Sequence, residues 1–93
     1  MRIIGYIEHP HLKITVFKMN NRLSVKFESG LYEQIYKFRE RDDLKNIEQM
    51  KQLVDSQLIT EVEKGLTQMH QQKNRALARY LPPIEENEFD DLI

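Results

Sequence analysis

Residues 12–38 read LKITVFKMNNRLSVKFESGLYEQIYKF, and apolar and polar side chains alternate through most of this stretch. The alternation has a period of two and is rich in β-branched and aromatic residues, which is typical of half-buried β-strands. Two turn-forming pairs, Asn20-Asn21 and Ser29-Gly30, divide the stretch into three runs. Because Asn and Gly tolerate a positive φ, each pair suits a tight hairpin. The stretch therefore predicts three antiparallel strands in sequence order.

The same alternation extends toward the N-terminus through Ile3, Gly5 and Ile7, followed by a turn at Pro10. This run adds a fourth strand, so residues 1–40 are expected to form a four-stranded antiparallel β-meander. Alternate side chains of the four strands then share one apolar face, which needs a cover.

The lengths of the loops determine which residues lie opposite each other. A two-residue Asn-Asn loop places Val16 opposite Val25, and a two-residue Ser-Gly loop brings Tyr32 opposite Phe27. A loop of two or four residues around the proline places Ile3 opposite Val16. All three pairings put the apolar side chains on one face, whereas a one-residue slip in the first hairpin would turn Ile3 to the other face.

From Asp42 onward the apolar residues recur every three or four positions, which is typical of amphipathic helices. Asp42 or Asp43 is expected to cap the first turn, and Pro82-Pro83 ends the helical pattern. Residues from about 42 to 80 are therefore expected to form two helices or one bent helix packed on one sheet face. The predicted fold class is α+β.

The chain is expected to divide into a compact domain and a tail. Residues 1–81 are predicted to form a single compact α+β domain, and residues 82–93 an acidic, mobile C-terminal tail. The last five residues, FDDLI, resemble the acidic, hydrophobic-ended tails with which bacterial single-stranded-DNA-binding proteins recruit partners. Three roles stay open for this tail: recruiting a partner, masking the protein's own basic surface, or raising solubility.

The second part of the helical segment is longer than the sheet. A helix from residue 57 to Tyr80 rises about 36 Å, whereas an eight-residue strand spans about 26 Å. The last apolar residues of the helical stripe then lack a partner in a monomer: Ala76, Leu77, Tyr80 and Leu81. Either a symmetric dimer covers them or a bend at Gly65 folds them back. Gly65 also suits a close approach of the helix to the sheet.

The sheet face opposite the helices is predicted to mix apolar and basic side chains. A solvated face is expected to be polar, and a contiguous exposed apolar patch is typical of a contact surface. The predicted binding residues are Arg2, Ile4, Tyr6, Lys13, Phe17, Arg22, Lys26, Ile35 and Lys37. The alternative is that part of the helical segment covers this face and that these residues belong to the core.

Composition excludes several classes of protein. The chain has 93 residues, 40% of them hydrophobic and 31% charged, which fits one small folded domain. No apolar stretch approaches the roughly 20 residues of a membrane span, and the first residues lack the apolar stretch of an export signal, so a cytoplasmic location is expected. The absence of cysteine excludes disulfides and thiolate metal sites.

Catalytic and cofactor sites are not expected. The sequence holds no nucleophile motif and no glycine-rich phosphate loop. Glu8, His9 and His11 are close in sequence, but a solvated turn explains them better than a metal site. We therefore expect no enzyme activity, no cofactor and no metal.

The distribution of charge and the predicted sheet face together indicate a binding protein. Residues 1–41 carry eight Lys and Arg against four Glu, while residues 42–93 carry six against eleven acidic residues. We expect a non-catalytic interaction module, a homodimer or a protein-partner adaptor, that uses the exposed basic and apolar sheet face. The alternative is single-stranded RNA or DNA on the same face, because basic residues interleaved with Tyr6 and Phe17 suit phosphates and stacked bases. In its order of elements the chain resembles single-strand binders of the Whirly and PUR type, and this resemblance implies the same alternative.

Overall fold

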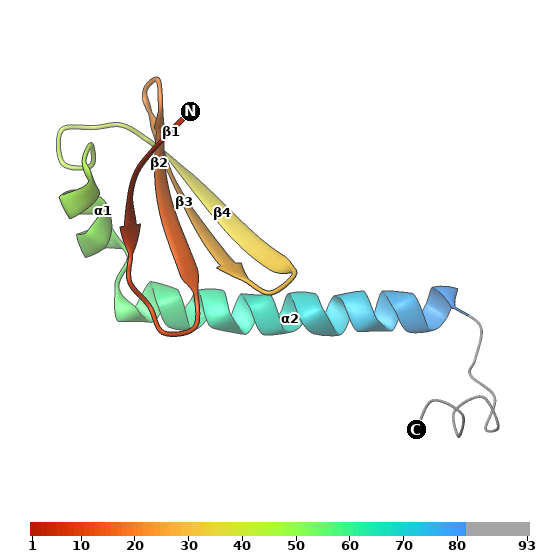
Figure 1. Ribbon diagram of the computed structural model, residues 1–93. Helices are drawn as coiled ribbons and strands as arrows, with labels where there is room; N and C mark the ends of the chain where they lie inside the picture. Colours follow the sequence, from red (N-terminus) through yellow and green to blue (C-terminus); the bar gives the residue numbers. More distant parts are fainter. Residues whose placement is uncertain (82–93) are drawn as a thin grey trace.

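The computed structural model describes residues 1–81 as a four-stranded antiparallel sheet followed by two helices (Figure 1). The elements are β1 (Arg2–Ile7), β2 (Lys13–Met19), β3 (Arg22–Ser29), β4 (Tyr32–Arg39), α1 (Ile47–Leu53) and α2 (Ser56–Tyr80). The strand order is β1-β2-β3-β4, so the predicted α+β fold with a meander sheet is confirmed. The predicted acidic tail, residues 82–93, lies outside the described residues. Within residues 1–81, no helix is both long enough and apolar enough to cross a membrane.

The hairpin between β2 and β3 has the predicted register. Val16 lies opposite Val25, and Met19 and Arg22 close a two-residue loop. Asn20, the first loop residue, has φ 53, a left-handed conformation that asparagine tolerates better than most residues. The Asn20-Asn21 pair therefore forms the two-residue loop that the sequence predicts.

The hairpin between β3 and β4 is shifted by two residues from the prediction. Tyr32 lies opposite Ser29 rather than Phe27, and Gly30 and Leu31 form the loop. Gly30 has φ 58, which favours glycine as the first of two loop residues. Because a shift of two residues preserves the alternation of side chains, the predicted register was wrong but the predicted faces are correct.

The first hairpin departs further from the prediction. Gly5, not Ile3, lies opposite Val16, and the register changes at a β-bulge between Ile3 and Gly5. Ile3 consequently lies opposite Phe17 and is 50% exposed, while Ile4 packs against the core. A bulge adds one residue to one strand, so the side chains beyond it change face.

Both helices begin at a capping side chain. The Asn46 carboxamide oxygen accepts a hydrogen bond from the Gln49 amide at 2.8 Å, and the Asp55 carboxylate accepts one from the Leu58 amide at 2.8 Å. The predicted cap at Asp42 or Asp43 was wrong, because these residues lie in a turn closed by reciprocal backbone hydrogen bonds between Arg41 and Leu44. The helical segment therefore forms two helices.

Gly65 marks a close approach of α2 to the sheet. A Cβ atom added at Gly65 would lie 2.5 Å from Nε2 of Gln34, which donates a hydrogen bond to the Val62 carbonyl at 3.0 Å. Helix α2 continues from Ser56 to Tyr80 through this position. The predicted alternative of a bend that folds the distal half back was therefore wrong.

The core lies between the helices and one side of the sheet, called here the inner face. Val16, Val25, Phe27 and Val62 are 0% exposed. The core residues are Leu12, Ile14, Val16, Leu23, Val25, Phe27, Leu44, Met50, Val54, Val62 and Leu66. Helix α2 crosses beneath one end of the sheet and continues past β4 (Figure 1).

Candidate functional site

The candidate site is the side of the sheet that faces away from the core, called here the outer face. Its position follows from the strand pairing, because residues directly opposite each other point to the same side. The outer-face residues are Ile3, Tyr6, Lys13, Thr15, Phe17, Met19, Arg22, Ser24, Lys26, Glu28, Glu33, Ile35, Lys37 and Arg39. Seven of the nine predicted binding residues are among them: Tyr6, Lys13, Phe17, Arg22, Lys26, Ile35 and Lys37.

The two other predicted binding residues lie elsewhere. Ile4 packs against the core cluster, and Arg2 lies opposite Lys18, whose position in β2 belongs to the inner face. Both errors come from the β1 bulge, which exchanges the faces of the residues before it. Ile3 takes the place of Ile4 on the outer face. The adjacent pair Ile3-Ile4, followed by Gly5, was the signal in the sequence, because either isoleucine can face the core and a glycine within a strand often marks a bulge.

The apolar half of the outer face is built by β1 and β2. Ile3 and Tyr6 are 50% and 53% exposed, and Met19 is 45% exposed. Phe17 is half-buried, with the ammonium group of Lys26 5.3 Å from its ring centroid, within the range of a cation–π contact. The described helices pack on the inner face, so the exposed parts of these side chains form an apolar surface.

Thr15 lies at the centre of the outer face between Tyr6 and Lys26, its cross-strand neighbours. It is 2% exposed, and its hydroxyl oxygen has no hydrogen-bond partner among the described residues. Lys26 also makes an ion pair with Glu28 at 3.2 Å. The longer neighbouring side chains therefore cover Thr15 at the middle of the outer face, and the exposed side chains lie around it.

The charged half of the outer face belongs to β3 and β4. Arg22 lies opposite Arg39, and Glu28 lies opposite Glu33. Like charges directly opposite each other destabilise a sheet. A recess of about 590 Å³ at this end is lined by both arginines, Met19, the Asn20-Asn21 turn and Glu40, whose carboxylate makes an ion pair with Lys18 at 3.2 Å. An anionic group bound there would relieve the repulsion between the two arginines.

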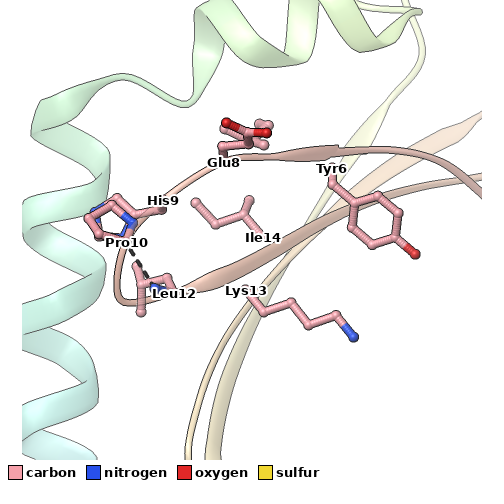
Figure 2. Close-up of a pocket in the computed structure, with 8 residues that line it drawn as sticks. Tyr6, Glu8, His9, Pro10, Leu12, Lys13 and Ile14 are labelled. Carbon is pink, nitrogen blue, oxygen red and sulfur yellow. Dashed lines mark hydrogen bonds between the residues drawn. The ribbon is translucent and has the colours of Figure 1, made fainter.

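A second recess, of about 640 Å³, lies beside the β1–β2 connection (Figure 2). Figure 2 shows Tyr6 and Lys13 extending on one side of this hairpin and Ile14 on the other. The Nδ1 atom of His9 accepts hydrogen bonds from the backbone amides of His11 and Leu12, at 3.1 and 3.2 Å. His9 therefore stabilises the turn, and that nitrogen is already occupied. In residues 1–81 no three His, Cys, Asp or Glu side chains come together as a metal site would require.

A polar cluster that the sequence did not predict joins α2 to β4. The Tyr32 hydroxyl and Nδ1 of His70 are 2.7 Å apart, and Nε2 of His70 lies 3.1 Å from the Asn74 amide nitrogen. The ammonium group of Lys73 lies 5.2 Å from the centroid of the Tyr32 ring. Lys73 is the last α2 residue in this cluster, and all residues from 71 to 81 are exposed.

Three comparisons, with protein-family models, with curated proteins and with solved structures, each found no match. The likeness to Whirly and PUR proteins accordingly remains a similarity in the order of elements.

Proposed function

We propose that the protein is a non-catalytic interaction module whose outer face binds a protein partner, and that the chain also associates with a second copy of itself. The observation that carries the first part is the apolar half of the outer face. Ile3, Tyr6 and Met19 are each about half exposed on one open sheet surface. Exposed apolar groups gathered on one surface are typical of sites that bind another protein.

The arrangement of the outer face suits a partner with apolar anchors and acidic groups beside them. Tyr6 and Phe17 offer aromatic surface, which is enriched among the residues that dominate binding energy. Lys37 and Arg39, both on the edge strand β4, supply positive charge at the rim. Rim charges of this kind steer association and favour a partner of opposite sign.

Substitution of the aromatic anchors tests the protein-binding proposal. Tyr6→Ala and Phe17→Ala should each weaken binding of the partner about tenfold or more, as truncation of a buried interface anchor does. Proteins retained from a cell extract are compared between the wild type, the two variants and Lys51→Ala, an exposed control on α1. A protein that only the two outer-face variants lose is then purified and titrated by calorimetry.

Circular dichroism separates loss of binding from loss of folding. Because Tyr6 is 53% exposed, Tyr6→Ala should leave the thermal transition nearly unchanged. If the purified partner binds both outer-face variants as tightly as it binds the wild type, the outer face is not its binding site.

The paired arginines favour a second candidate function, the binding of single-stranded nucleic acid. Arg22 and Arg39 lie directly opposite each other and share one recess, and Tyr6 offers an exposed ring for stacking. If about four basic side chains contact phosphates, affinity for an oligothymidylate should fall about 50-fold between 50 and 200 mM salt. Fluorescence anisotropy measures this, with Arg22→Ala as the variant and Lys51→Ala as the control. An apolar protein contact should change little over the same range of salt.

A further inference from the structure

One edge of the sheet has no partner strand. β4 has β3 on one side and no strand on the other in the described chain. Ser29 and Tyr32 close a two-residue loop, and the Glu40 amide donates to the Asn21 carbonyl at 2.7 Å. In an antiparallel pair the bonded positions alternate, so even-numbered β4 residues bond to β3. The backbone groups that point away from the sheet are those of Glu33, Ile35, Lys37 and Arg39.

The opposite edge differs, because β1 carries the bulge between Ile3 and Gly5. Helix α1 also packs beside β1, and Ile47 lies so close that a Cβ at Gly5 would be 2.9 Å from it. Bulges and covering elements are the usual means by which sheet edges avoid pairing with another chain. The regular register of β4 with β3, by contrast, contains no bulge. β4 is therefore the edge that is ready to accept another strand.

Helix α2 extends under the space beyond this edge. It passes beneath β4 and continues past it (Figure 1). Residues 74–80, called here the overhang, are all exposed and rise about 10 Å, the width of about two strands. Leu77 and Tyr80 in the overhang are 41% and 85% exposed. A sheet that continued past β4 would lie on these apolar side chains.

We propose that β4 pairs with β4 of a second copy of this chain, about a twofold axis perpendicular to the sheet, and that each α2 overhang covers the inner face of the other copy. This inference rests on the self-association proposed above and assigns its surface. A twofold axis of this kind makes the strands antiparallel and keeps both inner faces on one side. The two outer faces then form one continuous surface.

The side chains of β4 are complementary to themselves in one register. With Ile35 on the axis, Glu33 of each copy lies opposite Lys37 of the other, giving two pairs of opposite charge. Ile35, which is 49% exposed, then lies opposite its own counterpart. Opposite charges and paired apolar side chains are the cross-strand neighbours that stabilise a sheet.

In the same register, the overhang of each copy lies against a partly exposed region of the other copy's inner face. Helix α2 crosses β4 at Tyr32 and Gln34, where it makes its hydrogen bonds to the strand. With Ile35 on the axis, these residues lie opposite Phe38 and Tyr36 of the other copy. The helices of a single chain leave Phe38 half-buried and Tyr36 39% exposed. The overhang of the second copy therefore reaches the uncovered part of the inner face.

The distance between the two α2 helices favours this register over those shifted by two residues. The two α2 helices would cross the joined sheet four residues apart, or about 13 Å, which leaves room for helices that pack at 8–10 Å. A shift of two residues in one direction brings them to about 7 Å, where they collide. The opposite shift separates them by about 20 Å, beyond contact.

Charge exchange at two positions tests the pairing. Glu33→Lys places lysines opposite each other, and Lys37→Glu places glutamates opposite each other, so each single variant should raise the dimer Kd about tenfold or more. The double variant E33K/K37E should restore the wild-type Kd, and an equal mixture of the two single variants should form heterodimers. Sedimentation velocity over a roughly hundredfold range of concentration measures these equilibria, since mass action makes the dimer fraction depend on concentration. In the monomer Glu33 lies opposite Glu28, so Glu33→Lys does not threaten the fold.

Cysteine cross-linking provides a second measurement. The described chain has no free cysteine, so Ile35→Cys introduces a single thiol. Two such residues on the axis would lie about 5.5 Å apart at Cα, a separation that a disulfide spans. Mild oxidation should cross-link Ile35→Cys but not Lys51→Cys, the control on α1.

The outcomes of these measurements distinguish the self-association, the β4 pairing and the outer-face proposal. A wild-type chain that stays monomeric at every concentration overturns both the self-association and the β4 pairing, and leaves the outer-face proposal untouched. A dimer that the charge variants and Ile35→Cys leave unaffected overturns the β4 pairing alone. If the chain stays monomeric and the Ile35→Cys thiol forms a disulfide with a different protein, the β4 edge binds a strand of that protein. This result overturns the proposal that a second copy pairs with β4.

Discussion

The first half of α2 packs on the sheet, whereas the second half, residues 71–80, is exposed throughout. The apolar positions continue across the boundary, from Val62 and Leu66 to Leu77 and Tyr80. Val62 is 0% exposed and Leu66 7%, while Tyr80 is 85% exposed. An amphipathic pattern thus predicts that a helix forms, but what covers the helix depends on where the sheet ends.

The largest expected difference between the two halves concerns stability. Leu66→Ala should lower the free energy of unfolding by about 2–4 kcal/mol, because it removes a buried side chain and leaves a cavity. Leu77→Ala, the matched substitution in the overhang, should change it by less than about 0.5 kcal/mol in the monomer. Urea denaturation at a concentration where the chain is monomeric measures both. Equal losses would mean that the overhang packs within its own chain.

The contact at Gly65 should give an intermediate effect. Gly65→Ala gains about 1 kcal/mol of helix propensity but displaces the Gln34 side chain from the Val62 carbonyl, a hydrogen bond worth about 1 kcal/mol. The single substitution should therefore be nearly neutral in the wild type.

The same substitution in a Gln34→Ala background isolates the coupling between Gly65 and Gln34. In Gln34→Ala the obstructing side chain is gone, so Gly65→Ala should stabilise the protein by about 1 kcal/mol. A double-mutant cycle measured by urea denaturation gives the difference. If Gly65→Ala has the same effect in both backgrounds, the helix does not press on Gln34.

The smallest expected effect lies at the boundary between the two halves. Tyr32→Phe removes the hydroxyl that lies 2.7 Å from Nδ1 of His70, in an exposed hydrogen bond, and should cost about 0.5 kcal/mol. Hydrogen exchange measured by mass spectrometry should show faster exchange around residues 67–75 and no change in β2 and β3. A uniform increase across the sheet would instead assign Tyr32 a role in global stability.

The faces of the sheet were predictable because alternation constrains them strongly. Val16 and Phe27 are buried and Phe17 lies on the other side, as the period of two requires. The observed pairing of β4 with β3 differs from the predicted pairing by two residues, and an even shift leaves each side chain on its predicted face. Only Gly30, with its left-handed backbone, decides which two residues form the loop.

The parts of the candidate site that escaped prediction depend on contacts far apart in the sequence. The β1 bulge that exchanges Ile3 and Ile4 lies where Ile47 of α1 approaches Gly5. His70 and Tyr32 are 38 residues apart in the sequence, and only the fold brings them together. The free β4 edge, by contrast, follows from the predicted meander, whose strand order is confirmed.

The strand order also has a consequence for how the chain reaches this structure. Every pair of adjacent strands is consecutive in sequence, and two of the three hairpins have two-residue loops. Closing such short loops costs little chain entropy, and domains dominated by local pairing refold faster than those that join distant segments. Each sheet is therefore expected to form within one chain, so the refolding rate should be independent of protein concentration. In the proposed dimer, only the rate of assembly should rise with concentration.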